Sequence, residues 1–270
     1  MKLQINYVGV NEMVDFENLT TESNNKSSIQ IALHGSRDSL VKLRKIVAMF
    51  FSESDSHYST MHVAAYREIM LQAQDAINKE NMGFHLIKEI EAEVIRYLDT
   101  DRFLIQSNVY LRASRPIENS ETENIGWHRE TFYGPEMGKS INCWTPVEGV
   151  NEDNTLRYIP ESQLIPDDNI VVEQEVSGST ERFSAGHKLG FQYSPKKIVS
   201  GVDLSNSSKL LVKDGESALF SGNLIHGAAV NKGKSIRFSV DFRLIKKVDY
   251  SANNKQHHVT SSKPYFVEYC

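Results

Sequence analysis

The stretch RFSVDFRL at residues 237–244 shows the pattern on which the fold prediction rests. Apolar and polar residues alternate along it, so Phe238 and Phe242 share one face of an extended strand. Arg237 and Ser239 share the opposite face. This alternation is typical of a strand that has one side against an apolar core.

Similar short runs, rich in β-branched and aromatic residues, recur from Asp101 onward. Turn-forming sequences such as NEDN, PDDN, KDG and NKGK separate them. Many short strands without helices between them indicate a double-sheet jelly roll or a barrel. The predicted strands cover residues 103–111, 139–147, 154–160, 170–176, 208–212, 216–220 and 235–245.

The first hundred residues show a helical pattern instead. Apolar residues recur at three- and four-residue steps over 38–51, 61–78 and 83–98, which predicts three amphipathic helices that pack onto something larger. The sequence therefore predicts a mainly β protein with helical additions, a double-stranded β-helix (jelly roll) buttressed by N-terminal helices.

The 270 residues are enough to bury a large core, and we expect a single domain. Residues 1–100 would be mostly helical support, 101–247 the jelly-roll core and 248–270 a tail. The polar stretch 177–202 contains Gly and Ser and predicts a long loop, which we expect to act as a lid.

Composition narrows the class of partner. The net charge is −5 with both signs mixed, which argues against nucleic acid as the main partner. Two Cys make neither a disulfide framework nor a zinc module and indicate a reducing compartment. The N-terminus lacks the pattern of a signal peptide, and the apolar run IVAMFF at 46–51 is far shorter than the roughly 20 residues of a membrane helix. We expect a cytoplasmic protein whose main partner is not a nucleic acid.

Two short motifs carry the predicted chemistry, while P-loop, GxGxxG, GxSxG and HExxH motifs are absent from the sequence. His128 and Glu130 are two residues apart, so at a strand end their side chains point to the same face. If the distant His226 joins them, two His and one carboxylate occupy three positions of an octahedron and leave three free, which suits non-haem Fe(II). An Arg with a hydroxyl two residues along, as in Arg237 and Ser239, is a good receptor for a carboxylate.

The combination of His-x-Glu, a distal His and an Arg eleven residues after it resembles the Fe(II)/2-oxoglutarate-dependent oxygenases, in particular the phytanoyl-CoA dioxygenase-like family. In that family the first pair is followed by a strand with a Trp, an acidic turn and the pattern LRxxPGSH. Here INCWTPV at 141–147 is followed by EDN at 152–154 and by LRYIPESQ at 156–163. The resemblance covers roughly 103–244. Two departures are Glu130 in place of the usual Asp and PESQ in place of PGSH.

The resemblance implies that His128, Glu130 and His226 bind iron and that Arg237, with Ser239, holds the distal carboxylate of 2-oxoglutarate. Further residues that it places in the co-substrate pocket are Tyr110, Asn142, Trp144, Gln106 and Asn108. Candidate substrate residues are His187 and Lys188 in the predicted lid and Arg157, with Arg112 and Arg243 as further candidates for the pocket wall. Arg129, between two predicted ligands, is expected to face the other side and form a salt bridge.

The activity implied by the resemblance is hydroxylation, or a related desaturation, ring formation or epoxidation, in which O2 is consumed and 2-oxoglutarate yields succinate and CO2. Halogenating relatives have Gly or Ala at the carboxylate position, so Glu130 argues against halogenation. The polar lid favours a small polar substrate such as an amino acid, a sugar or a natural-product intermediate. Two alternatives are a non-catalytic jelly-roll ligand-binding protein with a relic metal site and a zinc hydrolase, for which no sequence feature supplies a general base.

Overall fold

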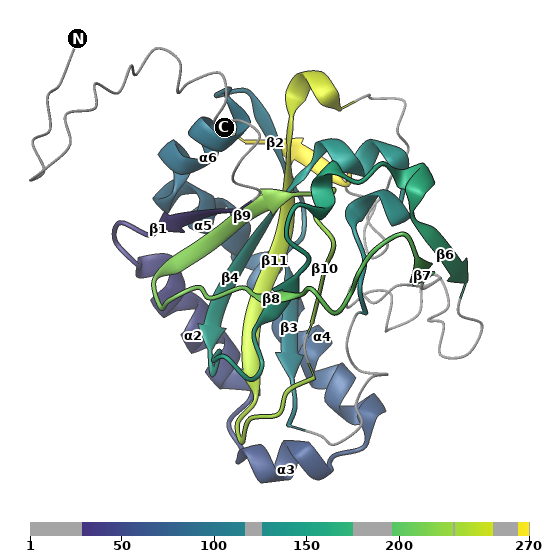
Figure 1. Ribbon diagram of the computed structural model, residues 1–270. Coiled ribbons are helices and arrows are strands. Elements are labelled where there is room, and N and C mark those ends of the chain that lie inside the picture. The colour runs from purple at the N-terminus through teal and green to yellow at the C-terminus, as the bar shows by residue number, and fades with distance from the viewer. Residues whose placement is uncertain (1–28, 117–125, 175–195, 229, 251–263, 270) are drawn as a thin grey trace, which may run out of the picture.

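The computed structural model describes residues 29–116, 126–174, 196–228, 230–250 and 264–269 (Figure 1). These residues form two main antiparallel sheets, with helices packed on the outside of the larger one. The arrangement confirms the predicted jelly roll with helical additions.

The larger sheet has seven strands in the order β1-β9-β4-β11-β2-β12, and β3 pairs with the N-terminal half of β11. The strand β11 therefore lies at the centre of the sheet, between β4 on one side and β2 with β3 on the other. The bounds are Ile29–Leu33 (β1), Phe103–Gln106 (β2), Tyr110–Ser114 (β3), Ile141–Glu148 (β4), Glu216–Ser221 (β9), Arg237–Lys246 (β11) and Phe266–Glu268 (β12).

The smaller sheet has the order β10-β5-β8, and β6 and β7 form a separate two-stranded ribbon. Their bounds are His226–Ala228 (β10), Leu156–Tyr158 (β5), Ser208–Lys209 (β8), Val171–Gln174 (β6) and Lys196–Ser200 (β7). Leu156 of the smaller sheet packs in one apolar cluster with Trp144 and Phe220 of the larger sheet. The two sheets thus face each other across this cluster.

The helices are Asp38–Phe50 (α2), Asp55–Thr60 (α3), Val63–Lys79 (α4), Met82–Glu89 (α5) and Glu91–Leu98 (α6). Helices α2, α4 and α5 contact β4, β3 and β2, and in Figure 1 they lie on the side of the larger sheet away from β8 and β10. Phe242 and Leu244 of β11 pack there against Leu40 of α2 and Ile77 of α4. Because side chains alternate along a strand, Arg237, on the other parity, points to the interior between the sheets.

The predicted strand 103–111 is wrong in one respect, because β2 and β3 are separate strands. Between them the side chain of Asn78 in α4 accepts a hydrogen bond from the backbone N–H of Val109 (2.7 Å) and donates one to its carbonyl (3.1 Å). This side chain takes the place of a neighbouring strand, so the chain leaves the sheet here and re-enters it at Tyr110.

The predicted helix 83–98 is also interrupted, at Ile90, whose φ of −125° and ψ of 22° separate α5 from α6. The preceding residue, Glu89, is drawn towards the start of α2, where its carboxylate accepts a hydrogen bond from the backbone N–H of Ser39 (2.8 Å). The apolar period continues across the interruption, since Ile87, Ile90 and Val94 are all buried.

The predicted loop 177–202 is wrong at its C-terminal end, where Lys196–Ser200 forms β7, and residues 177–195 lie outside the described residues. Where the sequence predicts a tail, Phe266–Glu268 forms β12 and pairs with β2. The short elements β1, α3 and β10 were not predicted either. Across the described ranges, every helix is too short or too polar to cross a bilayer.

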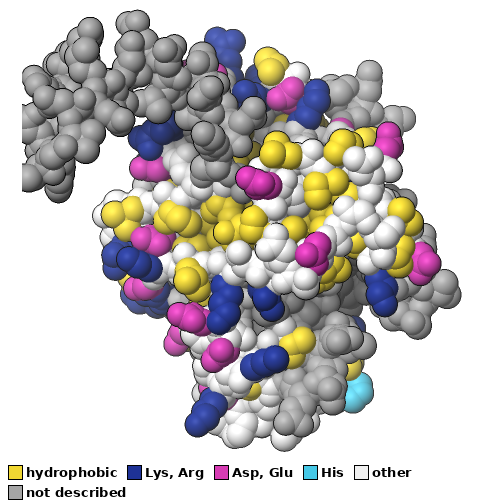
Figure 2. Space-filling model, viewed as in Figure 1, with side chains coloured by type: hydrophobic (Ala, Val, Ile, Leu, Met, Phe, Trp, Pro, Cys, Tyr) yellow, Lys and Arg dark blue, Asp and Glu magenta, His cyan; other side chains and the backbone are white. Residues whose placement is uncertain are grey.

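Figure 2 shows apolar side chains in a band across the face that carries the smaller sheet, with charged side chains around it. Exposed apolar residues in the structure include Ile31 and Leu33 of β1 and Leu211 after β8. Among the described strands β1 is an edge strand of the larger sheet, and Ile31 and Leu33 are exposed on the side opposite to the buried Ala32, which packs with the helices.

Candidate metal centre

His128 and His226 lie directly opposite each other on adjacent antiparallel segments. The backbone N–H of each donates to the carbonyl of the other, both at 2.9 Å, and their ring centroids are 4.3 Å apart. Main-chain pairing therefore fixes the relative position of the two imidazoles before any side-chain contact is considered.

Each imidazole is also held by a carbonyl of its own segment. Nδ1 of His128 donates to the carbonyl of Gly126 (2.8 Å), and Nδ1 of His226 donates to that of Leu224 (2.9 Å). A carbonyl only accepts, so in the neutral rings Nε2 carries the lone pair. Burial, with a further contribution from His226, lowers the pKa of His128 to about 3, and burial also lowers the pKa of His226. Both rings are therefore neutral bases near pH 7.

Glu130 begins the 3-10 turn Glu130–Phe132, and its backbone N–H donates to the carbonyl of Gly222 (2.8 Å). Its carboxylate is fully buried. Burial by itself raises the pKa of a carboxyl, but the guanidinium of Arg243 outweighs it and holds the pKa of Glu130 below its usual value. Nε of Arg243 donates to Oε2 at 2.5 Å, while Oε1 has no hydrogen-bond partner among the described residues.

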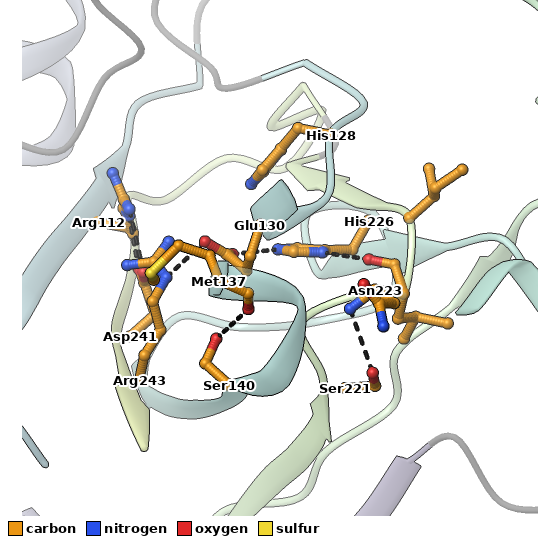
Figure 3. A network of polar contacts seen from close by, with 12 residues as sticks. Arg112, His128, Glu130, Met137, Ser140, Ser221, Asn223, His226, Asp241 and Arg243 are labelled. Atoms are coloured by element: carbon orange, nitrogen blue, oxygen red, sulfur yellow. Dashed lines mark hydrogen bonds and ion pairs between the residues drawn. The ribbon is translucent and has the colours of Figure 1, made fainter. Parts of the chain in front are cut away.

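The three side chains converge on one point (Figure 3). Oε1 of Glu130 lies 3.9 Å from Nε2 of His226, and one ligand atom from each of His128, Glu130 and His226 lies within 4.8 Å of the others. A buried carboxylate oxygen and imidazole lone pairs that face one another repel unless a cation lies between them. This donor set fits a divalent transition metal, and two His with one carboxylate are typical ligands of non-haem Fe(II).

Arg237 and Ser239 lie on the inner face of β11, as predicted. Arg237 is 2% exposed, its guanidinium donates to Oγ of Ser239 at 3.3 Å, and its Nε has no partner among the described residues. Burial and then the charge of Arg112 lower the pKa of Arg237 to about 10. A buried cation with an unused donor, on the face of the larger sheet that points towards the smaller sheet and His226, is suited to hold a carboxylate.

The other residues predicted in the co-substrate pocket divide into two groups. The first group lies next to Arg243. Gln106 accepts hydrogen bonds from Arg243, and the ring centroid of Tyr110 is 5.9 Å from its guanidinium carbon. Asn142 of β4 is paired with Arg243 of β11. Trp144 instead packs in the apolar cluster between the sheets.

Two predicted arginines lie away from the histidines. Arg129 forms an ion pair with Asp167 and donates to the carbonyl of Ile165 (2.8 Å), so it faces away from the ligands as expected. Tyr158 is paired with His226, and because neighbouring strand residues face opposite sides, Arg157 is not brought to the candidate metal centre. His187 and Lys188 lie outside the described residues.

The sequence analysis missed Asp241, whose carboxylate binds Arg112 through two hydrogen bonds of 2.5 and 3.0 Å. Arg112 holds the pKa of Asp241 below its usual value against the opposing effect of burial. The alternation that places Arg237 and Ser239 on the inner face also places Asp241 and Arg243 there, and this was the available signal.

The fold and the three converging side chains define a class of protein: a jelly roll with a candidate non-haem metal centre. The family model described as "Phytanoyl-CoA dioxygenase (PhyH)" matches residues 41–239, which is most of the chain. The chain belongs to the phytanoyl-CoA dioxygenase family. This confirms the resemblance and, with it, the Fe(II)/2-oxoglutarate-dependent class of enzymes.

Solved structures are similar in fold. EvdO2 from Micromonospora carbonacea var. aurantiaca has a TM-score of 0.54 at 13% identity over 95% of this chain and 100% of that chain, and its complex with 2-oxoglutarate has 0.51 at the same identity and coverage. The epimerase SnoN in complex with Fe3+, alpha ketoglutarate and nogalamycin RO has 0.49 at 11% identity over 92% of each chain. A comparison with curated protein sequences finds no match.

Proposed function

We propose that this protein is an Fe(II)- and 2-oxoglutarate-dependent oxygenase that hydroxylates a small polar molecule. One observation carries the proposal: Oε1 of the fully buried Glu130 faces Nε2 of His226 at 3.9 Å, without a hydrogen-bond partner among the described residues. An orphaned carboxylate oxygen beside two neutral imidazoles is costly in a metal-free core and becomes favourable when a cation is bound.

His128, Glu130 and His226 would hold the iron. Bound there, iron supplies the oxidation of a substrate C–H bond by O2, with conversion of 2-oxoglutarate to succinate and CO2. Arg237 and Ser239 bind the distal carboxylate of 2-oxoglutarate, and their burial strengthens this contact by excluding water.

The polar side chains near Glu130 favour a polar substrate. Asn142 lies beside Arg243 on the inner face of the larger sheet, and its buried Nδ2 has no hydrogen-bond partner among the described residues, so an apolar acyl chain there would leave it unpaired. This supports a polar substrate such as an amino acid, a sugar or a natural-product intermediate. His187 and Lys188 stay predictions as residues that close over it.

The first test is anaerobic. Metal-free protein receives Fe(II) and then 2-oxoglutarate, and the weak visible charge-transfer band of the chelated complex is recorded. Wild type is expected to show the band, His226→Ala to lose it because one ligand is gone, and Arg237→Ala to need a higher 2-oxoglutarate concentration because the distal carboxylate loses its cation. His85→Ala removes an exposed histidine of α5 and is the matched control.

Turnover is then measured as succinate formed with and without candidate polar molecules. A substrate is expected to raise succinate formation and to gain one oxygen atom in mass. If wild type neither binds iron at one equivalent nor shows the band, the oxygenase proposal fails and the non-catalytic ligand-binding alternative replaces it.

A further inference from the structure

Glu130 poses a geometric problem as a candidate ligand. It has one methylene more than the Asp usual at this position, and so one more rotatable bond to restrain. It also lies in the 3-10 turn after the His128 bridge, where strand pairing no longer sets the direction of its side chain. Some other group must therefore hold the carboxylate in place.

Arg243 is that group. Its Nε donates to Oε2 of Glu130 at 2.5 Å, and the side chains are 7% and 0% exposed (Figure 3). A charge-assisted hydrogen bond of this kind is strong where water is excluded. It uses Oε2 and leaves Oε1 facing His226.

The guanidinium is itself fixed from several sides. Gln106 of β2 accepts hydrogen bonds from the backbone N–H of Arg243 (3.1 Å) and from Nη1 (3.2 Å). The ring centroids of Tyr110 and Tyr133 each lie 5.9 Å from its Cζ. The central strand β11 thus presents a preorganised cation to the carboxylate.

We propose that Arg243 is a positioning residue of the metal centre: it binds Oε2 of Glu130 and so selects Oε1 as the single oxygen directed at the metal. The inference rests on the proposed function. Held in this way, the carboxylate takes one coordination position, and its charge is balanced when no metal is bound. The longer Glu is accommodated because Arg243 restrains it.

The test is the affinity for Co(II), titrated anaerobically without 2-oxoglutarate and followed by its visible spectrum, so that the readout does not depend on turnover. Arg243→Met is expected to bind Co(II) about 10- to 100-fold more weakly and with an altered spectrum, which is the usual effect of removing a partner of a metal ligand. Arg243→Lys keeps the charge and is expected to bind with intermediate affinity, and it serves if the Met variant fails to fold.

Arg112→Met is the matched control. It removes an arginine from a second Arg–carboxylate pair on the same face, that with Asp241, in which Glu130 takes no part. Its Co(II) affinity is expected to stay within about threefold of wild type. Unchanged affinity and spectrum in Arg243→Met, or equal losses in Arg112→Met and Arg243→Met, overturn the positioning role alone. Failure of wild type to bind Co(II) overturns the proposed function as well.

Discussion

At the scale of single residues, the candidate centre depends on a glycine. The N–H of Gly222 donates to the carbonyl of Ser140, and its own carbonyl accepts from the N–H of Glu130, both at 2.8 Å. A Cβ at position 222 would lie 2.6 Å from the carbonyl oxygen of Met137 and 2.8 Å from that of Ser140. The turn after β9 therefore approaches Glu130 as closely as it does only because residue 222 has no side chain.

Gly222→Ala is expected to push this turn away from Glu130. Overpacking of this kind costs roughly 1–3 kcal/mol, measured as the free energy of unfolding in denaturant. The affinity for Co(II) should fall as well, because the N–H of Glu130 loses its acceptor. Gly126→Ala is the control, since a Cβ there meets no atom within 4 Å, and equal effects of the two variants would contradict the argument.

His128, Glu130 and His226 could be proposed from the sequence because the His-x-Glu pair, the distal His and the Arg eleven residues after it together resemble a family pattern. The role of Arg243 could not be predicted from the sequence, although the residue was a candidate for the pocket wall. Its contact with Glu130 depends on how β11 and the turn after His128 are placed in space, and this placement follows from tertiary packing and not from spacing along the chain.

At the scale of elements, a row of three hydrogen-bonded side chains joins helix α5 to the larger sheet. Oε2 of Glu89, at the end of α5, lies 2.9 Å from Nδ1 of His34, and Nε2 of His34 lies 2.7 Å from Oγ of Ser217 in β9. The order of groups resembles a hydrolytic triad, but Ser217 is fully buried. A nucleophile needs access to a substrate, so these contacts fasten α5 to the sheet.

His34→Ala is expected to lower the free energy of unfolding by roughly 1–3 kcal/mol, because Glu89 and Ser217 lose a buried partner. The effect should depend on pH. Burial lowers the pKa of His34 in the folded state, so the unfolded chain binds the proton more readily and stability is lost as pH falls below the ordinary value of 6.5. Denaturant unfolding from about pH 7 to about pH 5 should therefore show a shallower decline in the variant than in wild type.

The control for this experiment is His85→Ala, which removes an exposed histidine from α5. It should leave both the stability and its pH dependence close to wild type. A decline as shallow in His85→Ala as in His34→Ala would assign the pH dependence to another group.

Elements with a clear period were predictable from the sequence, among them α2, α4, β4 and β9. The interruptions were not. Asn78 separates β2 from β3, and Glu89 accompanies the break between α5 and α6, in both cases through contacts with residues far away in the chain. The three-residue strand β10 is too short to show a period and exists because both His128 and β5 pair with it.

At the scale of the whole molecule, one face of the larger sheet packs against the helices and the other faces the candidate metal centre. One apolar cluster extends from Ala32 to Leu244 and joins the helices to the outer face, while the inner face points towards the candidate metal centre and supplies Arg243, the partner of Glu130. Because a single cluster includes both the helices and the sheet, we propose that the chain is one domain and expect it to unfold in one transition.

The separation of faces predicts two independent kinds of variant. Ile77→Val in the helix-side cluster is expected to lower the free energy of unfolding by about 0.5–1.5 kcal/mol and to keep the stabilisation gained from a bound metal. At a metal concentration about 100 times the Kd, that gain is about 2.7 kcal/mol. His226→Ala should lose the gain. Thermal unfolding with and without Co(II) measures both, and loss of the gain in Ile77→Val would show that the faces are coupled.

The central position of β11 also bears on synthesis. Among the described strands, β3 pairs only with β11, and β2 pairs with β11 and β12, so the segments at Phe103–Gln106 and Tyr110–Ser114 have no partner strand until residues 237–246 have left the ribosome. The helices can form on the nascent chain, but the larger sheet is incomplete until β11 is present, so the apolar faces of the helices are only partly buried. Assembly of the barrel is therefore a late event, and until then the emerging polypeptide exposes the kind of apolar surface that chaperones bind.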